Sequence, residues 1–172
     1  MVWDFEKGLS SLTKSPTLEK SWLAENFFVA DYSSSLPSSV LKIFGKPDKI
    51  FESFRENGIK TVVFDSVTNW SQHLLWELTT RAGLEGPDWP VRNAASMKLR
   101  RFFQRFLGDI SEAGVNVVCI FQTQMLSKSE NVKEVCPSVI GQQLPTQVLG
   151  FFDNFFYLDV SQKEKERRRF LL

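Results

Sequence analysis

The sequence predicts a three-layer α/β domain in which a mostly parallel sheet is flanked by helices. Short apolar or β-branched segments alternate with segments of helical spacing, and short turns separate them. This order of strand, helix and strand is typical of parallel sheets with crossover helices. A chain of 172 residues, 42% of them hydrophobic, is long enough for one such domain and its core.

The expected elements follow from the local patterns. Strands are predicted at 27–30, 61–64, 115–121 and 155–160, with a further one beginning at 170–172. Helices are predicted at 48–56, 69–81 and 99–110, the last with apolar residues at steps of three and four. Gly58 and Gly114 are expected to end the helices before them. Residues 33–39, 83–90 and 127–145 are expected to be a polar break and two loops.

The domain organisation is expected to be simple. Residues 1–26 are expected to form an N-terminal helical or irregular segment, and residues 27–172 the α/β core. Lys and Arg number 21 against 20 Asp and Glu, so any nucleic-acid contact requires a local patch. Two cysteines are too few for a disulfide framework or a zinc site, and no signal-peptide or membrane-spanning pattern is visible. We therefore expect a cytoplasmic protein with reduced thiols and no membrane contact.

Polar residues follow two of the predicted strands, at the edge where parallel sheets bind ligands. Asp65 and Ser66 follow the strand at 61–64, where a carboxylate can hold Mg²⁺ opposite nucleotide phosphates. The simpler interpretation is a cap for the next helix. Gln122 and Gln124 follow the strand at 115–121, where an amide can contact a γ-phosphate or its attacking water. A loop glutamine bonded to backbone is the alternative.

Other candidates have simpler structural interpretations. Basic residues in and next to the helix at 99–110 could meet DNA phosphates, although a solvated helix face is the simpler interpretation. Trp70, Trp76 and Trp89 could stack on bases, although core packing is the ordinary role of aromatics at helical spacing. His73, the only histidine, has no metal-ligand partners at suitable spacing. The basic residues that could meet DNA phosphates are Lys98, Arg100, Arg101 and Arg105.

Together these features resemble the RecA-like ATPases. The passage 144–158, LPTQVLGFFDNFFYL, is similar to one in phage-encoded RecA-like nucleotide-binding proteins, which assist recombination and single-strand annealing. The resemblance covers residues 27–172. It implies a RecA-like sheet, ATP and Mg²⁺ as cofactors, and single-stranded DNA as a partner. It also implies a homo-oligomer or assembly with an intact homologue, in a bacterial cell or a phage-infected host.

The resemblance also implies roles for the strand-end residues. Asp65 matches the family's Walker B aspartate, which binds Mg²⁺ and the nucleotide, and Ser66 matches the serine beside it. Gln122 or Gln124 matches the polar catalytic sensor at the end of the next core strand. The cluster at 163–169 lies where family members have a charged hairpin, although a solvated turn is the simpler interpretation.

The chain departs from the family at the phosphate-binding loop. The family needs G-x-x-x-x-G-K-[ST], because its backbone amides cradle phosphates and its Lys neutralises them. No such motif occurs here: the only Gly-Lys pair, Gly45-Lys46, precedes Pro47, and position 40 is Val. The N-terminal phosphate-loop unit is therefore expected to be missing.

A second departure concerns the catalytic base. The family strand that matches 27–30 ends in Asp-x-Glu, whose Glu polarises the attacking water. This chain has Asp31-Tyr32-Ser33 there, and a serine cannot act as a general base at neutral pH.

Three functions compete on this basis. The first is a RecA-like ATPase associated with DNA recombination or annealing, impaired by the missing phosphate loop. The second is a non-catalytic module of the same fold that binds DNA, a partner or other copies of itself. The third is an unrelated α/β enzyme with Asp65 in its crevice, ranked last because no nucleophile and base pair is recognisable.

Overall fold

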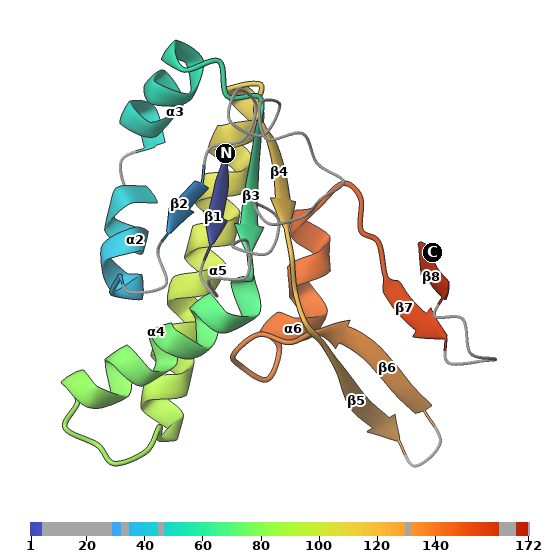
Figure 1. Ribbon diagram of the computed structural model, residues 1–172. Coiled ribbons are helices and arrows are strands. Elements are labelled where there is room, and N and C mark those ends of the chain that lie inside the picture. Colours follow the sequence, from blue (N-terminus) through green and yellow to red (C-terminus); the bar gives the residue numbers. More distant parts are fainter. Residues whose placement is uncertain (5–28, 32–34, 45–46, 130–131, 162–167, 172) are drawn as a thin grey trace.

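The computed structural model describes residues 1–4, 29–31, 35–44, 47–129, 132–161 and 168–171 (Figure 1). These residues form a mixed α/β protein with one parallel sheet and two small antiparallel sheets. The strands are β1 (Val2–Asp4), β2 (Val29–Asp31), β3 (Thr61–Asp65), β4 (Asn116–Cys119), β5 (Thr123–Ser129), β6 (Val132–Pro137), β7 (Leu158–Ser161) and β8 (Arg168–Leu171). The helices are α2 (Pro37–Phe44), α3 (Pro47–Glu56), α4 (Val67–Arg81), α5 (Trp89–Glu112), α6 (Leu144–Gln147) and the 3₁₀ helix η2 (Val148–Phe151).

The parallel sheet has four strands in the order β2-β1-β3-β4. All three pairings are parallel, so the carboxyl ends of the strands lie at one edge. β1 belongs to the segment expected to be helical or irregular, yet it lies between β2 and β3, with Asp4 in register with Asp31 and Asp65. Its three residues are too few to show a strand pattern in the sequence, so only pairing with both neighbours reveals it.

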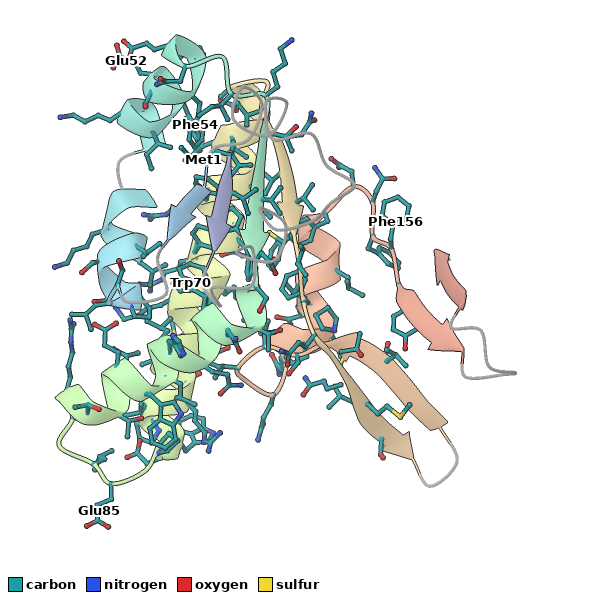
Figure 2. The ribbon with its side chains drawn as sticks, in the orientation of Figure 1. Met1, Glu52, Phe54, Trp70, Glu85 and Phe156 are labelled. Carbon is teal, nitrogen blue, oxygen red and sulfur yellow. The ribbon has the colours of Figure 1, made fainter. Side chains whose placement is uncertain are left out.

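One face of the sheet is covered by α5, which runs behind the strands in Figure 1. Phe64 of β3 packs edge-on against Phe102 and Phe106 of α5, with ring centroids 5.6 and 5.8 Å apart. Trp70 of α4 closes the group, 4.9 Å from Phe102, and lies between α4 and the sheet (Figure 2). These side chains have at most 5% of their surface exposed. The apolar repeat at steps of three and four that was predicted for residues 99–110 is therefore confirmed in α5.

The opposite face of the sheet is less covered. Val63 of β3 is only partly buried, and Val118 of β4 keeps 45% of its surface exposed. Side chains alternate between the two faces of a strand, so these two residues point away from the buried Phe64. Within the described residues, one helix layer on the sheet is therefore evident, and the expected second layer is not.

Several predicted elements differ in the structure. The expected loop at 127–145 contains most of the β5–β6 hairpin and ends in α6, because polar strands pair through their backbones without an apolar signal. The strand expected at 155–160 is β7, which pairs antiparallel with β8 outside the parallel sheet. α2 begins inside the serine-rich break, and α5 begins inside the loop expected at 83–90. Among the helices of the described segments, none is both long and apolar enough to cross a bilayer.

Candidate functional site

The carboxyl ends of β3 and β4 meet at the position predicted for a ligand. The Ile120 amide donates to the Phe64 carbonyl (3.0 Å), and the Val67 amide donates to the Ile120 carbonyl (2.9 Å). Asp65 at the end of β3 is partly buried, and the peptide bond between Asp65 and Ser66 is cis. The two strand ends that carry the predicted site residues are therefore neighbours in one sheet.

Ser66 serves the fold at this edge. Its side chain is buried and caps α4, accepting a hydrogen bond from the Asn69 amide (3.3 Å). A hydroxyl at this position satisfies one of the amides that a helix start leaves without a partner. The sequence left open a cap by the strand-end aspartate, and in the structure the residue that caps α4 is Ser66.

The metal site implied by the family resemblance has few donors among the described residues. In these segments, no three His, Cys, Asp or Glu side chains gather closely enough to hold a metal ion. Asp65, in register with Asp4 and Asp31 at the strand ends, supplies one carboxylate, and the neighbouring Ser66 hydroxyl is engaged as a cap. Mg²⁺ bound by one carboxylate depends on phosphate oxygens and water for its remaining ligands. Asp65 and Ser66 do not make a Mg²⁺ site of their own.

The two glutamines after β4 have different surroundings. Gln124 is partly buried, and its side-chain amide donates to the Pro137 carbonyl across the hairpin (3.3 Å). The side chain of Gln122 is exposed, whereas its backbone is fixed by Thr68 and Ser138. Gln122 is therefore the glutamine whose side chain can reach a ligand. The side chain of Gln124 is instead engaged in a hydrogen bond that holds the hairpin.

A cavity of about 470 Å³ lies between the first half of α5 and the chain that enters α6. Two exposed guanidinium groups, Arg92 and Arg100, and the indole of Trp89, 68% exposed, lie on the α5 side. None of the described residues that line the cavity is Asp or Glu. Three amide side chains lie on the opposite side: Gln142, Gln143 and Gln147.

The two walls of the cavity are held close together at Gly141. A Cβ atom added there would lie 2.9 Å from the Cβ of Ser96 on α5 and still closer to its hydroxyl oxygen. The φ angle of Gly141 is +110°, a conformation that residues with side chains rarely adopt. Glycine at 141 therefore allows the loop to touch α5 and brings the glutamine amides opposite the arginines.

The start of α5 is fixed by a cap that is also near the cavity. The Asp88 carboxylate accepts a hydrogen bond from the Val91 amide (2.9 Å). The Arg92 side chain donates from Nε to the Pro87 carbonyl (3.2 Å). The Asp88 carboxylate, which precedes Trp89 in the sequence, is thus engaged by the helix terminus, and Arg92 is oriented by its bond to the preceding turn.

Part of this site was visible in the sequence. Arg100 and Trp89 were candidates for DNA contact, and the cavity contains both, whereas Arg101 and Arg105 lie outside it. Arg92 was missed because the helix was predicted to begin at 99, and the glutamines at 142, 143 and 147 were missed because no spacing in the sequence relates them to α5. His73 is exposed on α4, and the charged cluster at 163–169 falls largely outside the described residues.

The Asp-x-Glu pattern of the family occurs at another place than expected. The structure adds β1 beside β3, and β1 ends at Asp4, which is in register with Asp65. In the sequence Asp4 is followed by Phe5 and Glu6, so the pattern follows β1 rather than β2. Phe5 and Glu6 themselves lie outside the described residues.

Comparison with known proteins gives no further guide. No protein-family model, no curated protein and no solved structure matches this chain.

Proposed function

We propose that this protein is a nucleic-acid-binding module of RecA-like architecture, whose cavity between α5 and the start of α6 binds single-stranded DNA. The observation that carries the proposal is the composition of that cavity. Two guanidinium groups, an exposed indole and four side-chain amides gather there, and the described lining has no carboxylate.

Each group in the cavity matches a part of a single strand. Guanidinium groups bind phosphate oxygens in a bidentate manner, which suits Arg92 and Arg100. An exposed indole such as Trp89 provides a face on which an unpaired base stacks. The glutamine amides donate and accept hydrogen bonds and so suit the edges of bases. Because the chain has a net charge of only +1, binding depends on this local patch.

The test is a comparison of two double variants that remove the same charge from the same helix. Fluorescence anisotropy with labelled oligothymidine at low salt measures the affinity of each protein. We expect Arg92→Ala with Arg100→Ala to weaken binding about tenfold or more and to lower the salt slope by about 1.4, since each phosphate contact on a single strand contributes about 0.7. Arg101→Ala with Arg105→Ala should change both quantities much less, because neither residue lines the cavity.

Two results would contradict the proposal. The first is equal loss of affinity in the two double variants, which would show that only the net charge matters. The second is native protein that does not bind oligothymidine even at low salt. A Gly141→Ala variant adds an independent arm, because the new Cβ would push the loop from Ser96 and weaken binding without removing any charge.

A second candidate function is an ATPase whose phosphate-binding loop is supplied by residues other than this chain's own. It is supported by the adjacent strand ends with Asp65 and Gln122, and by Asp4-Phe5-Glu6 after the neighbouring strand. Because the 172-residue sequence lacks the phosphate-loop motif, we expect this chain alone to bind ATP·Mg²⁺ no more tightly than about 1 mM, or about −4 kcal/mol. Micromolar binding in isothermal titration would show that this chain binds the nucleotide without the motif, and would overturn the premise that the phosphate-binding loop is supplied by other residues.

A further inference from the structure

The hydroxyl of Thr68 joins three segments that are far apart in the sequence. It accepts a hydrogen bond from the Gln122 amide (3.0 Å) and donates one to the Ser138 carbonyl (2.7 Å). Thr68 lies in the first turn of α4 and has 3% of its surface exposed. A single buried hydroxyl therefore connects the start of α4, the end of β4 and the end of β6.

A second bond closes this connection. The Ser138 amide donates to the Gln122 carbonyl (2.7 Å), so both backbone groups of Gln122 are held. The chain then runs from Ser138 to Gly141, which is in contact distance of Ser96 on α5. The loop that carries the glutamine amides of the cavity therefore begins at Ser138, which is bonded to the Thr68 hydroxyl. It reaches α5 three residues later, at Gly141.

We infer that Thr68 is a positioning residue for the cavity: through Gln122 and Ser138 it fixes the loop at 138–143 relative to α5. This inference rests on the proposed function, since it concerns the same cavity. A threonine hydroxyl can donate and accept at once, as this position requires. Valine has nearly the same shape but offers neither bond, whereas serine keeps both.

The chain provides a matched control on the same helix. Thr79 is also buried on α4, with 1% of its surface exposed. Its hydroxyl donates to the Leu75 carbonyl of its own helix (2.8 Å) and so connects no second segment. Replacing either threonine by valine removes one buried hydroxyl, but only Thr68→Val removes a hydrogen bond to the loop at 138–143.

The experiment uses the full chain and two readouts. Hydrogen exchange of peptides covering 138–143 reports the loop without any DNA, and anisotropy with labelled oligothymidine reports the cavity. We expect Thr68→Val to speed exchange in this loop about tenfold and to weaken oligothymidine binding about tenfold, because a buried hydroxyl that makes two hydrogen bonds is lost. Thr68→Ser should stay within about twofold of the native protein in both readouts, because its hydroxyl keeps both bonds.

The outcomes separate this inference from the proposed function. Equal exchange in the loop of Thr68→Val and Thr79→Val would overturn the positioning role, as would failure of serine to rescue. If the native protein does not bind oligothymidine, the proposed function fails, while the exchange data still support or overturn the role of Thr68 in fixing the loop.

Discussion

Two regions of the molecule differ in what they present: the side of the parallel sheet that faces α5, and the chain beyond β4. The side facing α5 is filled by aromatic rings, and Phe64, Phe103 and Phe106 have at most 1% of their surface exposed. Beyond β4, the β5–β6 hairpin and the chain before β7 leave large apolar side chains in solvent, including Met125 at 70% and Phe156 at 72% (Figure 2). Between them, hydrogen bonds join the chain that enters the hairpin to the start of α4, and we call this part the border region.

This difference indicates how the molecule divides its tasks. The helix-covered side obtains its stability from close packing of large rings, which contribute through buried area and through edge-to-face geometry. The border region is held instead by a few hydrogen bonds that involve Thr68, Ser138 and Gln124. Such regions open at lower free energy than a packed core, and binding surfaces are drawn from them.

The largest expected effect is loss of the central ring on the helix-covered side. Phe102 contacts four other aromatic rings, so Phe102→Ala should lower the free energy of unfolding by about 3–5 kcal/mol. Urea unfolding followed by circular dichroism measures this. Met125→Ala, on the hairpin, should change it by less than about 0.5 kcal/mol. Similar losses in the two variants would remove the contrast between the two regions.

The same contrast governs what the sequence could predict. β3 was predicted from a continuous run of β-branched and apolar residues, and residues 99–110 of α5 from apolar side chains at steps of three and four, such as Phe102, Phe103 and Phe106. β1 and β5 were missed because their residues carry no such repeat and become strands only by pairing with distant segments. Local patterns thus revealed the packed side, and long-range hydrogen bonds determine the rest.

The candidate site was predictable to a similar extent. Asp65, Ser66 and Gln122 were identified because the ends of parallel strands converge at one edge. The cavity was not, because it exists only where Gly141 touches Ser96, 45 residues away in the sequence. Its arginines are therefore distinguished from the other basic residues of α5 by tertiary packing alone.

A smaller effect is expected from the polar network inside the helix layer. The Glu77 side chain, 5% exposed, accepts hydrogen bonds from the Ser38 amide and hydroxyl at the start of α2 and pairs with Arg81. Glu77→Gln removes the charge and one acceptor, so we expect a loss of about 1–2 kcal/mol in urea unfolding. Arg81→Ala should cost under about 1 kcal/mol, since its side chain is 54% exposed. A larger loss from Arg81→Ala would contradict this ranking.

The smallest expected effect uses the two thiols, one in each region. Cys119 packs against the aromatic core, and burial raises its pKa above the ordinary value of 9.0. Burial also raises the pKa of Cys136 at the base of the hairpin, helped by the Glu134 carboxylate and opposed by its bond to Gln124. In both cases the folded state disfavours the thiolate.

The sign of the pH dependence follows from these two shifts. Below pH 9 the thiols are neutral in both states, so their protonation does not change stability. Above pH 9 only the unfolded chain ionises Cys119 readily, so the native protein should lose about 1 kcal/mol more between pH 9 and 10 than Cys119→Ala does. Cys136→Ala should also reduce this slope, because burial disfavours its thiolate as well. Urea unfolding at the two pH values measures both, and a slope in Cys119→Ala equal to that of the native protein would contradict a buried neutral thiol beside the aromatic core.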